Sequence, residues 1–406
     1  MVRNMKTELT RKIPNSFVAY PALIALMIYV FGYQFAYPFS STLFLYIAFG
    51  FTVVWMVFNQ GIYFSAQMLI MALVAVVSAL GVFYTQSPKE GNREAILTIV
   101  VWILLIAFAQ NAAMLEKIKK AIYICSFAVL LGVLLQYLFA GAVNTVLSRI
   151  LRSDSYERLI WSYDVDGAYA GFSAYTPDAA YFCAALFGFT MFGRLQAKEL
   201  SFKKKIACWV VILLSVFAVI LTSKRGVAIA LIVSFVLTYM IWKKFSAKTI
   251  FSTIGLLAVC VILIGIFSEQ NEVIQMFLQR FDPTDGDITT GRSEIWKSAL
   301  DKLTNGFIGM GTGSAYVVYD TGLHNIYLQL FYDHGLVGVI IYLLFFISNL
   351  VYAIKRREAV AIYIQLLMLV YGMSGNPIYS NSFFIVYTIF SVVSVGEQEQ
   401  NATELS

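Results

Sequence analysis

Charged residues are scarce in this chain. Of its 406 residues only 13% are Asp, Glu, Lys or Arg, whereas 60% are hydrophobic. Soluble domains carry about 25% charged residues, so this chain cannot cover a globular surface with polar groups. The composition excludes a soluble globular protein and predicts an integral membrane protein.

Proline, cysteine and histidine are also rare. The 7 prolines exclude a collagen-like or low-complexity segment, and the 4 cysteines all lie in apolar runs without the paired spacing of zinc or redox sites. The two histidines, His324 and His334, are not spaced as a metal pair. We interpret the cysteines as packing residues and expect no metal, no other cofactor and no nucleic-acid partner.

Long apolar runs are abundant. Runs near the length that spans a bilayer, about 20 residues, recur along the whole chain. They predict an all-α polytopic membrane protein with about 12 transmembrane helices in a single integral membrane domain, residues 1–406. The first run lacks a small-residue cleavage site, so we interpret it as a retained helix. The predicted helices are 17–33, 41–58, 66–84, 95–111, 121–139, 175–193, 206–222, 227–242, 250–267, 335–354, 359–373 and 383–395.

The distribution of Lys and Arg predicts the orientation. If the amino terminus is cytoplasmic, 18 of the 29 Lys and Arg residues fall in segments on the same side. Positively charged loops are retained on the cytoplasmic side of a membrane. We therefore expect both termini on the cytoplasmic side, where residues 396–406 form a cytoplasmic tail.

Two predicted outside segments, residues 140–174 and 268–334, are too long to be simple connectors. Loops beyond about 15 residues in a compact protein are usually functional, so we expect the chemistry on the outer face, with 268–334 as the long extracytoplasmic loop. The predicted apolar cores contain no Lys, Arg, Glu or His, which disfavours a proton-driven pump. A lipid flippase with a polar cavity of loops and helix ends stays open.

Two adjacent cations, Lys224 and Arg225, occupy a short outside turn, where positive charge is usually avoided. An ammonium and a guanidinium at the membrane boundary suit a pyrophosphate, because each charged hydrogen bond to phosphate contributes about 1.5 to 3 kcal/mol. The alternative is a pair of cations that snorkel from helix ends.

A second motif runs from Gly291 to Leu300. Its apolar residues recur with helical period, so we expect an amphipathic helix that lies flat on the outer leaflet, with Trp296 at headgroup depth. Arg292 falls in the first turn, where free backbone N–H groups favour anions. The alternative is an ordinary interfacial helix with a solvated arginine.

His324 and Asn325 form a third motif, followed by nine residues and then by Gly335 and Gly338. Histidine accepts a proton near pH 7, so His324 is the candidate to assist deprotonation of a sugar hydroxyl, a contribution of about 10² to 10⁴ in rate. The alternative is a histidine that only hydrogen-bonds a loop.

A glycine-rich segment, Gly306–Gly313, lies between the second and third motifs. Glycine at alternate positions permits a close approach of backbone to a ligand. The segment neither follows a predicted strand nor opens a predicted helix, so we reject a nucleotide-binding loop. We expect a flexible turn that connects the amphipathic helix to His324.

Together these motifs resemble those of the O-antigen ligase and O-antigen polymerase superfamily, the Wzy and WaaL type of membrane glycosyltransferase. The resemblance rests on four elements in order within about residues 160–350. They are the Ser-Lys-Arg-Gly turn, the Gly-Arg-x-x-x-Trp run, the Phe-x-Gly-x-Gly stretch, and His-Asn with nine residues to Gly-x-x-Gly.

The resemblance implies a metal-independent transfer of a glycan from undecaprenyl pyrophosphate to an acceptor hydroxyl on the outer face of the membrane. It implies that Arg225 binds the pyrophosphate, that Arg292 assists or guides the lipid-linked substrate, and that His324 holds or activates the acceptor. The supporting residues that it implies are Asn325, Gly335 and Trp296.

The chain departs from the family pattern in two places. Family members often show Ser-Arg-Gly, whereas here Lys224 intervenes, so either Lys224 or Arg225 is the phosphate ligand. The family's sixth helix has a glycine followed by Asn-Pro-Asn, which Gly171–Asp178 only approximates. The role of Asp178 therefore stays open.

Polymerisation of surface polysaccharide repeat units, as in O-antigen, capsule or exopolysaccharide, is the leading function that the resemblance implies. A ligase that moves the finished glycan onto lipid A core or protein uses the same donor and differs in its acceptor. A flippase for the lipid-linked glycan belongs to a different class and would tolerate loss of His324. Peptidoglycan polymerases of the shape and division class also have a late loop, but not the His-Asn and Gly-Arg pattern. A chain-length regulator and a flippase are the expected partners.

Overall fold

The structure is a computed structural model. It describes residues 15–32, 35, 41–58, 65–110, 112–196, 200–243, 251, 272–279, 291–318, 322–378 and 381–392. Within these ranges every regular element is a helix, apart from one isolated antiparallel bridge between Phe35 and Leu151. The prediction of an all-α protein is confirmed.

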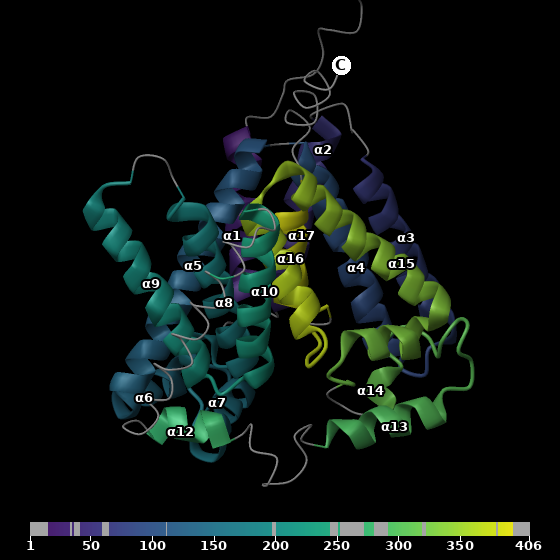
Figure 1. Cartoon of the computed structure of the whole chain (residues 1–406). Helices are drawn as coiled ribbons and strands as arrows, with labels where there is room; N and C mark the ends of the chain where they lie inside the picture. Colours follow the sequence, from purple (N-terminus) through teal and green to yellow (C-terminus); the bar gives the residue numbers. More distant parts are fainter. Residues whose placement is uncertain are drawn as a thin grey trace, which may run out of the picture.

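Helices follow one another with short connections along the described chain (Figure 1). In chain order they are α1 (Asn15–Phe31), α2 (Ser41–Phe58), α3 (Ala66–Gly81), α4 (Pro88–Ala109), α5 (Ala112–Leu138), α6 (Ala140–Ile150), α7 (Ser153–Asp166), α8 (Thr176–Gly188), α9 (Phe202–Leu221), α10 (Arg225–Lys243), α12 (Glu272–Gln279), α13 (Arg292–Lys302), α14 (Ala315–Val318), α15 (Ile326–Arg356), α16 (Ala359–Tyr371) and α17 (Asn381–Ser391). A π-helical turn, Phe189–Arg194, continues α8.

Six of the described helices are long and apolar enough to cross a membrane, which supports a membrane protein. They are Ala66–Tyr84, Pro88–Ala109, Ala113–Leu138, Phe202–Leu221, Arg225–Lys243 and Ile326–Arg356. The shorter apolar helices are Tyr20–Phe31, Thr42–Val57, Ala359–Tyr371 and Ser382–Ser391. Each predicted segment contains a helix except 250–267, which lies outside the described residues save residue 251. A total of twelve membrane spans therefore stays a prediction.

Several helices begin before the predicted membrane segments, and α4 and α15 show why. α4 begins at Pro88, because proline suits the first helical turn, and α15 begins at Ile326, because the Asn325 side chain caps it. An apolar run marks only the part of a helix that can face lipid, so the polar extensions were not predicted. Glu94 and His334 consequently lie inside α4 and α15. The predicted apolar cores themselves still contain no Glu or His, and whether the extensions of α4 and α15 lie in the membrane stays untested.

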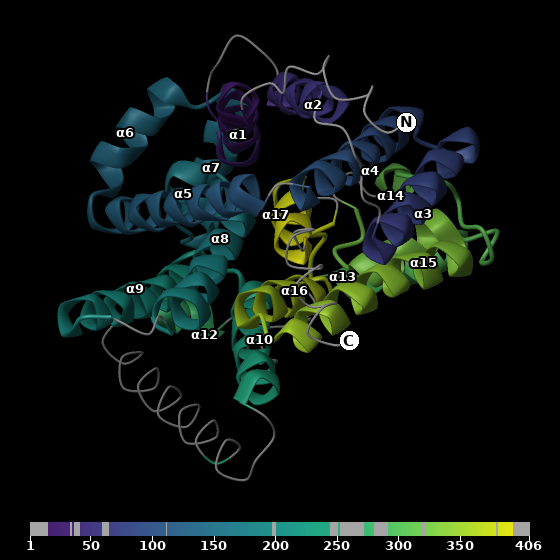
Figure 2. The same cartoon turned by 90° about the horizontal axis from the view of Figure 1, so that it is seen from above.

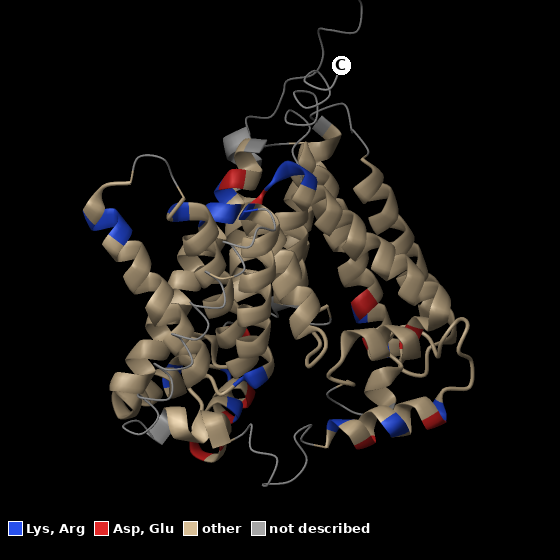
Figure 3. Ribbon diagram, in the orientation of Figure 1, with Lys and Arg blue, Asp and Glu red and all other residues tan. Residues whose placement is uncertain are grey.

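The two long segments predicted outside the membrane are themselves helical where they are described. Residues 140–174 contain α6 and α7, and residues 268–334 contain α12, α13 and α14. Figure 1 shows α6, α7, α12 and α13 at one end of the molecule, away from the carboxyl terminus. Lys and Arg lie at both ends of the bundle, and at the end that carries α7 and α13 they are interspersed with Asp and Glu (Figure 3). The predicted orientation remains untested.

The long helices form two groups around α16 and α17. α3 packs against α4 and α15 on one side, and α5 packs against α8 and α9 on the other. α16 contacts both groups, because it packs against α10 and α15. Figure 2, which looks along the bundle, shows α16 and α17 in the middle. Residues before α10 and before α15 thus meet at the connection between α16 and α17.

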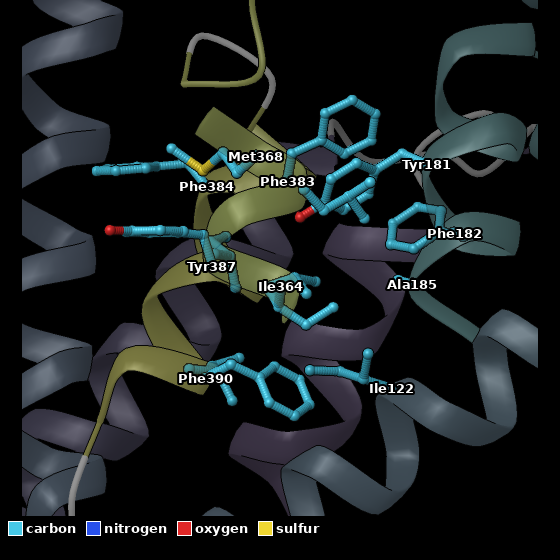
Figure 4. Close-up of a cluster of buried hydrophobic side chains, with 14 of the residues drawn as sticks. Ile122, Tyr181, Phe182, Ala185, Ile364, Met368, Phe383, Phe384, Tyr387 and Phe390 are labelled. Carbon is cyan, nitrogen blue, oxygen red and sulfur yellow. The ribbon is translucent and has the colours of Figure 1, made fainter. Parts of the chain in front are cut away.

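A dense aromatic core surrounds α8 and α17 (Figure 4). The ring of Tyr181 stacks on Phe383 with centroids 4.0 Å apart, and Phe182 meets the same ring edge-on at 5.9 Å. Tyr363 of α16 is fully buried and donates its hydroxyl hydrogen to the Ala184 carbonyl at 3.0 Å. Buried aromatic pairs add about 0.5 to 1.5 kcal/mol each to the burial of their surface. This core holds α16 rigidly behind the candidate site.

Candidate functional site

The turn between α9 and α10 carries the predicted phosphate-binding cations. α9 ends at Leu221, Ser223 adopts a left-handed φ of 55°, and α10 begins at Arg225. The Lys224 ammonium lies 3.8 Å from the carboxylate of Asp166, the last residue of α7. An ion pair therefore links the predicted first outside segment to the cationic turn. Asp166 was not predicted as a site residue, because it lies far from Lys224 in the sequence and only the fold brings the two together.

Arg292 is the first residue of α13. Gly291, with a left-handed φ of 80°, reverses the chain immediately before it. The Arg292 Nη1 group donates a hydrogen bond to the Ser374 carbonyl at 2.8 Å, and the side chain is half-buried. Burial lowers the pKa of Arg292, but a guanidinium stays charged at neutral pH. Its orientation is fixed by protein, so the alternative of a freely solvated arginine is excluded.

His324 and Asn325 precede α15. His324 has a left-handed φ of 52°. The Asn325 side-chain oxygen accepts hydrogen bonds from the backbone N–H groups of Tyr327 and Leu328, at 3.0 and 3.1 Å. Its amide nitrogen donates to the Met373 carbonyl at 3.3 Å. Asn325 therefore acts as a helix cap, and this cap places His324 directly at the start of α15.

The three predicted site segments interact electrostatically. The pKa of His324 is lowered to about 4, first by burial and then by the positive charges of Arg292 and Lys224. Positive charges lower the pKa of an imidazole appreciably only when they lie close to it in a partly buried site. Segments separated by up to a hundred residues therefore converge on one imidazole, which is neutral at pH 7. The electrostatic effect agrees with the motifs, and that these residues form one functional site stays a prediction.

Two of the predicted site segments contain a left-handed backbone conformation at a residue other than glycine. Among the described residues, four non-glycine residues have a positive φ: Ala174, Ser223, His324 and Arg357. The first three lie in segments that the sequence motifs singled out. Such conformations cost of order 1 to 3 kcal/mol and persist where the surroundings enforce them, often at functional sites. The backbone observation supports a functional role for the turns.

α13 is the predicted amphipathic helix, but its apolar face packs on protein. Ala299 is fully buried, and half-buried neighbours on the same face contact residues around α14 and the start of α15. The Trp296 indole N–H donates to the Leu323 carbonyl at 2.7 Å, one residue before His324. Leu300 on this helix is 47% exposed. The half-buried indole N–H thus finds its acceptor in the protein, and the expectation that Trp296 sits at headgroup depth stays a prediction. Through this bond Trp296 holds Leu323, the residue before His324.

Gly335 introduces a kink into α15, with φ 61° and ψ −164°. The backbone N–H groups of Leu336 and Val337 donate to the carbonyls of Gly306 and Phe307, at 2.9 and 3.2 Å. A Cβ atom at Gly335 would lie only 2.5 Å from the Gly309 nitrogen, so glycine is required there. The glycine-rich segment is thus packed into the kink, unlike the flexible turn predicted, because its missing side chains let two backbones touch.

A second group of ionisable residues lies beneath this segment. Asp333 is fully buried and accepts a hydrogen bond from the Ala315 N–H at 2.9 Å, and Glu94 of α4 is 7% exposed. Burial and the charges of both carboxylates raise the pKa of Tyr316. The sequence analysis missed Glu94, because it lies immediately before the predicted apolar run. Within the described residues no group of three His, Cys, Asp or Glu side chains could hold a metal ion.

Asp178, whose role the sequence left open, is buried in the first turn of α8. Burial and the negative charge of Asp178 raise the pKa of the neighbouring Tyr175. Tyr371 at the end of α16 lies within electrostatic reach of both Asp178 and Arg292. Tyr371 therefore links Asp178 electrostatically to Arg292, and the role of Asp178 stays open.

Comparison with known families identifies one domain. Residues 210–343 match the family model described as O-antigen ligase. The match contains the cationic turn, Arg292, His324 and Gly335, and confirms the resemblance to the O-antigen ligase and polymerase superfamily. A search among curated proteins gave no match.

Proposed function

We propose that this protein, whose residues 210–343 belong to the O-antigen ligase and polymerase superfamily, polymerises repeat units of a surface polysaccharide. In this proposal it transfers a glycan from undecaprenyl pyrophosphate to an acceptor sugar hydroxyl. The observation that carries the proposal is the convergence of the charges of Lys224 and Arg292 on His324. A cationic site beside a neutral imidazole suits a diphosphate leaving group and a hydroxyl that must lose its proton.

The donor diphosphate would bind among helix amino termini. Arg225 and Arg292 are the first residues of α10 and α13, and Asn325 caps α15. Unpaired backbone N–H groups and the helix dipole favour anions at such ends. Each charged hydrogen bond to phosphate adds about 1.5 to 3 kcal/mol. The combination supports a phosphate-binding role for these cations over a snorkelling one.

The chemistry needs no covalent nucleophile. Once its charge is balanced, a pyrophosphate departs readily, so cations aimed at the departing oxygens stabilise the transition state. The acceptor hydroxyl attacks the anomeric carbon, the bond to the pyrophosphate oxygen breaks, and His324 accepts the hydroxyl proton. Attack from the far side inverts the anomeric centre, which the linkage of the product would test.

Donor binding would also activate His324. In the free protein two cations and burial disfavour the imidazolium, so the imidazole is a weak base. A bound diphosphate brings negative charge next to Arg292 and Lys224 and offsets their effect. The pKa of His324 then rises, and the imidazole becomes a better proton acceptor once the donor is in place.

The proposal places the site on the outer face of the bacterial cytoplasmic membrane, with both termini inside. A chain-length regulator and a flippase would act as partners. The family match also fits a ligase that transfers the glycan to lipid A core or protein, because ligase and polymerase share the donor. A flippase is the alternative from a different class, and it would not depend on a base at His324.

Purified protein in lipid nanodiscs, supplied with an undecaprenyl pyrophosphate-linked repeat unit, tests the function. The polymerase lengthens the chains, as read by gel electrophoresis and mass spectrometry. Addition of lipid A core distinguishes the ligase, which makes a single transfer to it. Lys297→Gln on the exposed side of α13 is the matched control for removal of a cation and keeps wild-type activity. Movement of the lipid-linked glycan across vesicles without any transfer would contradict the proposal and favour the flippase.

A further inference from the structure

The connection between α16 and α17 touches every predicted site segment, although no motif singled it out. Three successive carbonyls in this connection accept hydrogen bonds from the beginnings of α13 and α15. The bonds are Ile326 N–H to Gly372 O at 2.8 Å, Asn325 Nδ2 to Met373 O at 3.3 Å and Arg292 Nη1 to Ser374 O at 2.8 Å. We call residues Gly372–Ser374 the carbonyl turn.

The carbonyl turn also contacts the cationic turn before α10. A Cβ atom built on Gly226 would overlap the Ser374 hydroxyl oxygen and lie 3.1 Å from the Ser374 Cβ. The next nearest atom is Cδ2 of Tyr371, at 3.7 Å, which is an ordinary contact. Glycine at position 226 therefore allows the backbone that follows Lys224 and Arg225 to rest directly on Ser374.

The carbonyl turn is held from behind by the aromatic core. The backbone N–H groups of Met373 and Ser374 donate to the carbonyls of Val370 and Tyr371, at 3.1 and 2.9 Å, so the turn continues the last turn of α16. A Cβ atom on Gly372 would lie 2.6 Å from Cγ1 of Ile326. Figure 1 shows this connection at the lower end of α16, between the two groups of helices. Its position is thus fixed relative to both.

We propose that the carbonyl turn is the positioning element of the donor site. It sets the separation between the Lys224–Arg225 pair and Arg292, through the Gly226–Ser374 contact on one side and the Arg292–Ser374 hydrogen bond on the other. Ser374 and Gly226 are positioning residues and not catalytic residues. The inference rests on the proposed function, because it assumes that these cations bind a diphosphate.

A positioning role follows from the geometry of a diphosphate. Its two phosphates must meet cations from two separate helices at the same time, and a displacement of about 1 Å in an active site can cost 100-fold in rate. Arg292 donates one of its five N–H groups to the Ser374 carbonyl. This bond fixes the orientation of the guanidinium, whose other N–H groups stay available to a phosphate. A backbone carbonyl at the end of a buried helix fixes this orientation better than a flexible side chain would.

A size-swap experiment tests the inference. Gly226 has no positive φ and lies in the first turn of α10, so Gly226→Ala disturbs only the contact with Ser374. We expect it to raise the KM for the undecaprenyl pyrophosphate donor about 10-fold to 100-fold, with little change in the KM for the acceptor. Ser374→Gly removes the atoms that the new methyl group meets. The double variant therefore recovers most of the donor affinity.

Gly141→Ala is the matched control, because nothing lies within 4 Å of a Cβ atom at this position of α6. It keeps wild-type kinetics. Amounts of folded protein and thermal unfolding in detergent are compared for all variants. Wild-type donor KM in Gly226→Ala, or no recovery in the double variant while both proteins are folded, would overturn the inference.

Binding separates this inference from the proposed function. The affinity of the same variants for undecaprenyl pyrophosphate alone, without acceptor, is measured in nanodiscs. Suppose that no transfer occurs but donor binding is weakened in Gly226→Ala and recovers in the double variant. The proposed transfer reaction is then wrong and the positioning role stands. A wild-type protein that does not bind undecaprenyl pyrophosphate contradicts both.

Discussion

The cationic turn before α10 and the carbonyl turn after α16 lie against each other but contribute different groups. The first presents the side chains of Lys224 and Arg225, and the second presents backbone carbonyls that hold Arg292 and Asn325. Side-chain charge is visible in a sequence as a motif, whereas any residue type supplies a carbonyl. The comparison shows that binding groups and positioning groups of one site differ in how far a sequence reveals them.

The strongest test of the binding side concerns His324. We expect His324→Ala to lower kcat by about 10² to 10⁴, because the acceptor hydroxyl loses its base, while the donor still binds to the cations. Single-turnover transfer and donor binding are measured in parallel. If the variant transferred glycan at the wild-type rate, the chemistry would not depend on the imidazole.

Removal of each adjacent cation should have the next largest effect. Arg225→Gln and Lys224→Gln each remove charged hydrogen bonds worth about 1.5 to 3 kcal/mol, which corresponds to about 10-fold to 100-fold in donor KM. We expect the smaller loss for Lys224→Gln, because Asp166 already neutralises part of the Lys224 charge. Initial rates at varied donor concentration give the donor KM of each variant. Equal donor KM values for both variants and the wild type would show that the pair only snorkels.

The pH dependence sharpens the link between the turns and His324. With a pKa lowered to about 4, His324 is the free base near neutrality, so donor kcat/KM should stay constant from about pH 8 to about pH 5 and fall below that. Lys224→Gln removes a positive charge, raises the pKa of His324 and moves the acid limb to higher pH. In the wild-type protein, the acid limb of kcat reports the pKa of His324 in the donor complex. It should lie at higher pH than the acid limb of kcat/KM. An unchanged limb in Lys224→Gln would separate the cation from the imidazole.

The smallest effect concerns the cap of α15. Asn325→Ala removes the side-chain acceptor for the backbone N–H groups of Tyr327 and Leu328, and loss of a cap costs about 0.5 to 2 kcal/mol of stability. We expect a lower unfolding temperature in detergent with a moderate loss of activity. Asn325→Ser keeps a capping oxygen and should restore the stability. If Asn325→Ser were as unstable as Asn325→Ala, the bond to the Met373 carbonyl would matter more than the cap.

The helical fold could be predicted from the sequence, but the ends of its helices could be predicted less well. Every predicted apolar run that the structure describes contains a helix, because a backbone in lipid must satisfy its own hydrogen bonds. The same criterion placed the starts of α4 and α15 too late, since it does not register a proline start or an asparagine cap. Glu94, Asp333 and His334 therefore fell outside the predicted helices, although they lie inside α4 and α15. The helices α6 and α7 were not predicted, because their residues are too polar to form an apolar run.

The site was predictable where chemistry requires a particular side chain. The motifs around Lys224, Arg292 and His324 predicted their convergence, since only cations and an imidazole supply those charges. Trp296 was predicted as a supporting residue, but its contact with the Leu323 carbonyl was not, because the same amphipathic pattern serves an interface with lipid or with protein. Nothing in the residues Gly372–Ser374 indicates their contact with Arg292.

The sequence by itself determined that this chain is an all-α protein with helices long and apolar enough to cross a membrane, and it predicted a site of cations and a histidine. Composition and side-chain charge carry this information, because both are properties of residues and survive any arrangement of helices. Only the tertiary structure decided that a buried helix and its carbonyl turn aim Arg292, and that the glycine-rich segment fills a kink. These features depend on backbone atoms that all residues share, and their meaning arises only when distant segments of the chain are brought together.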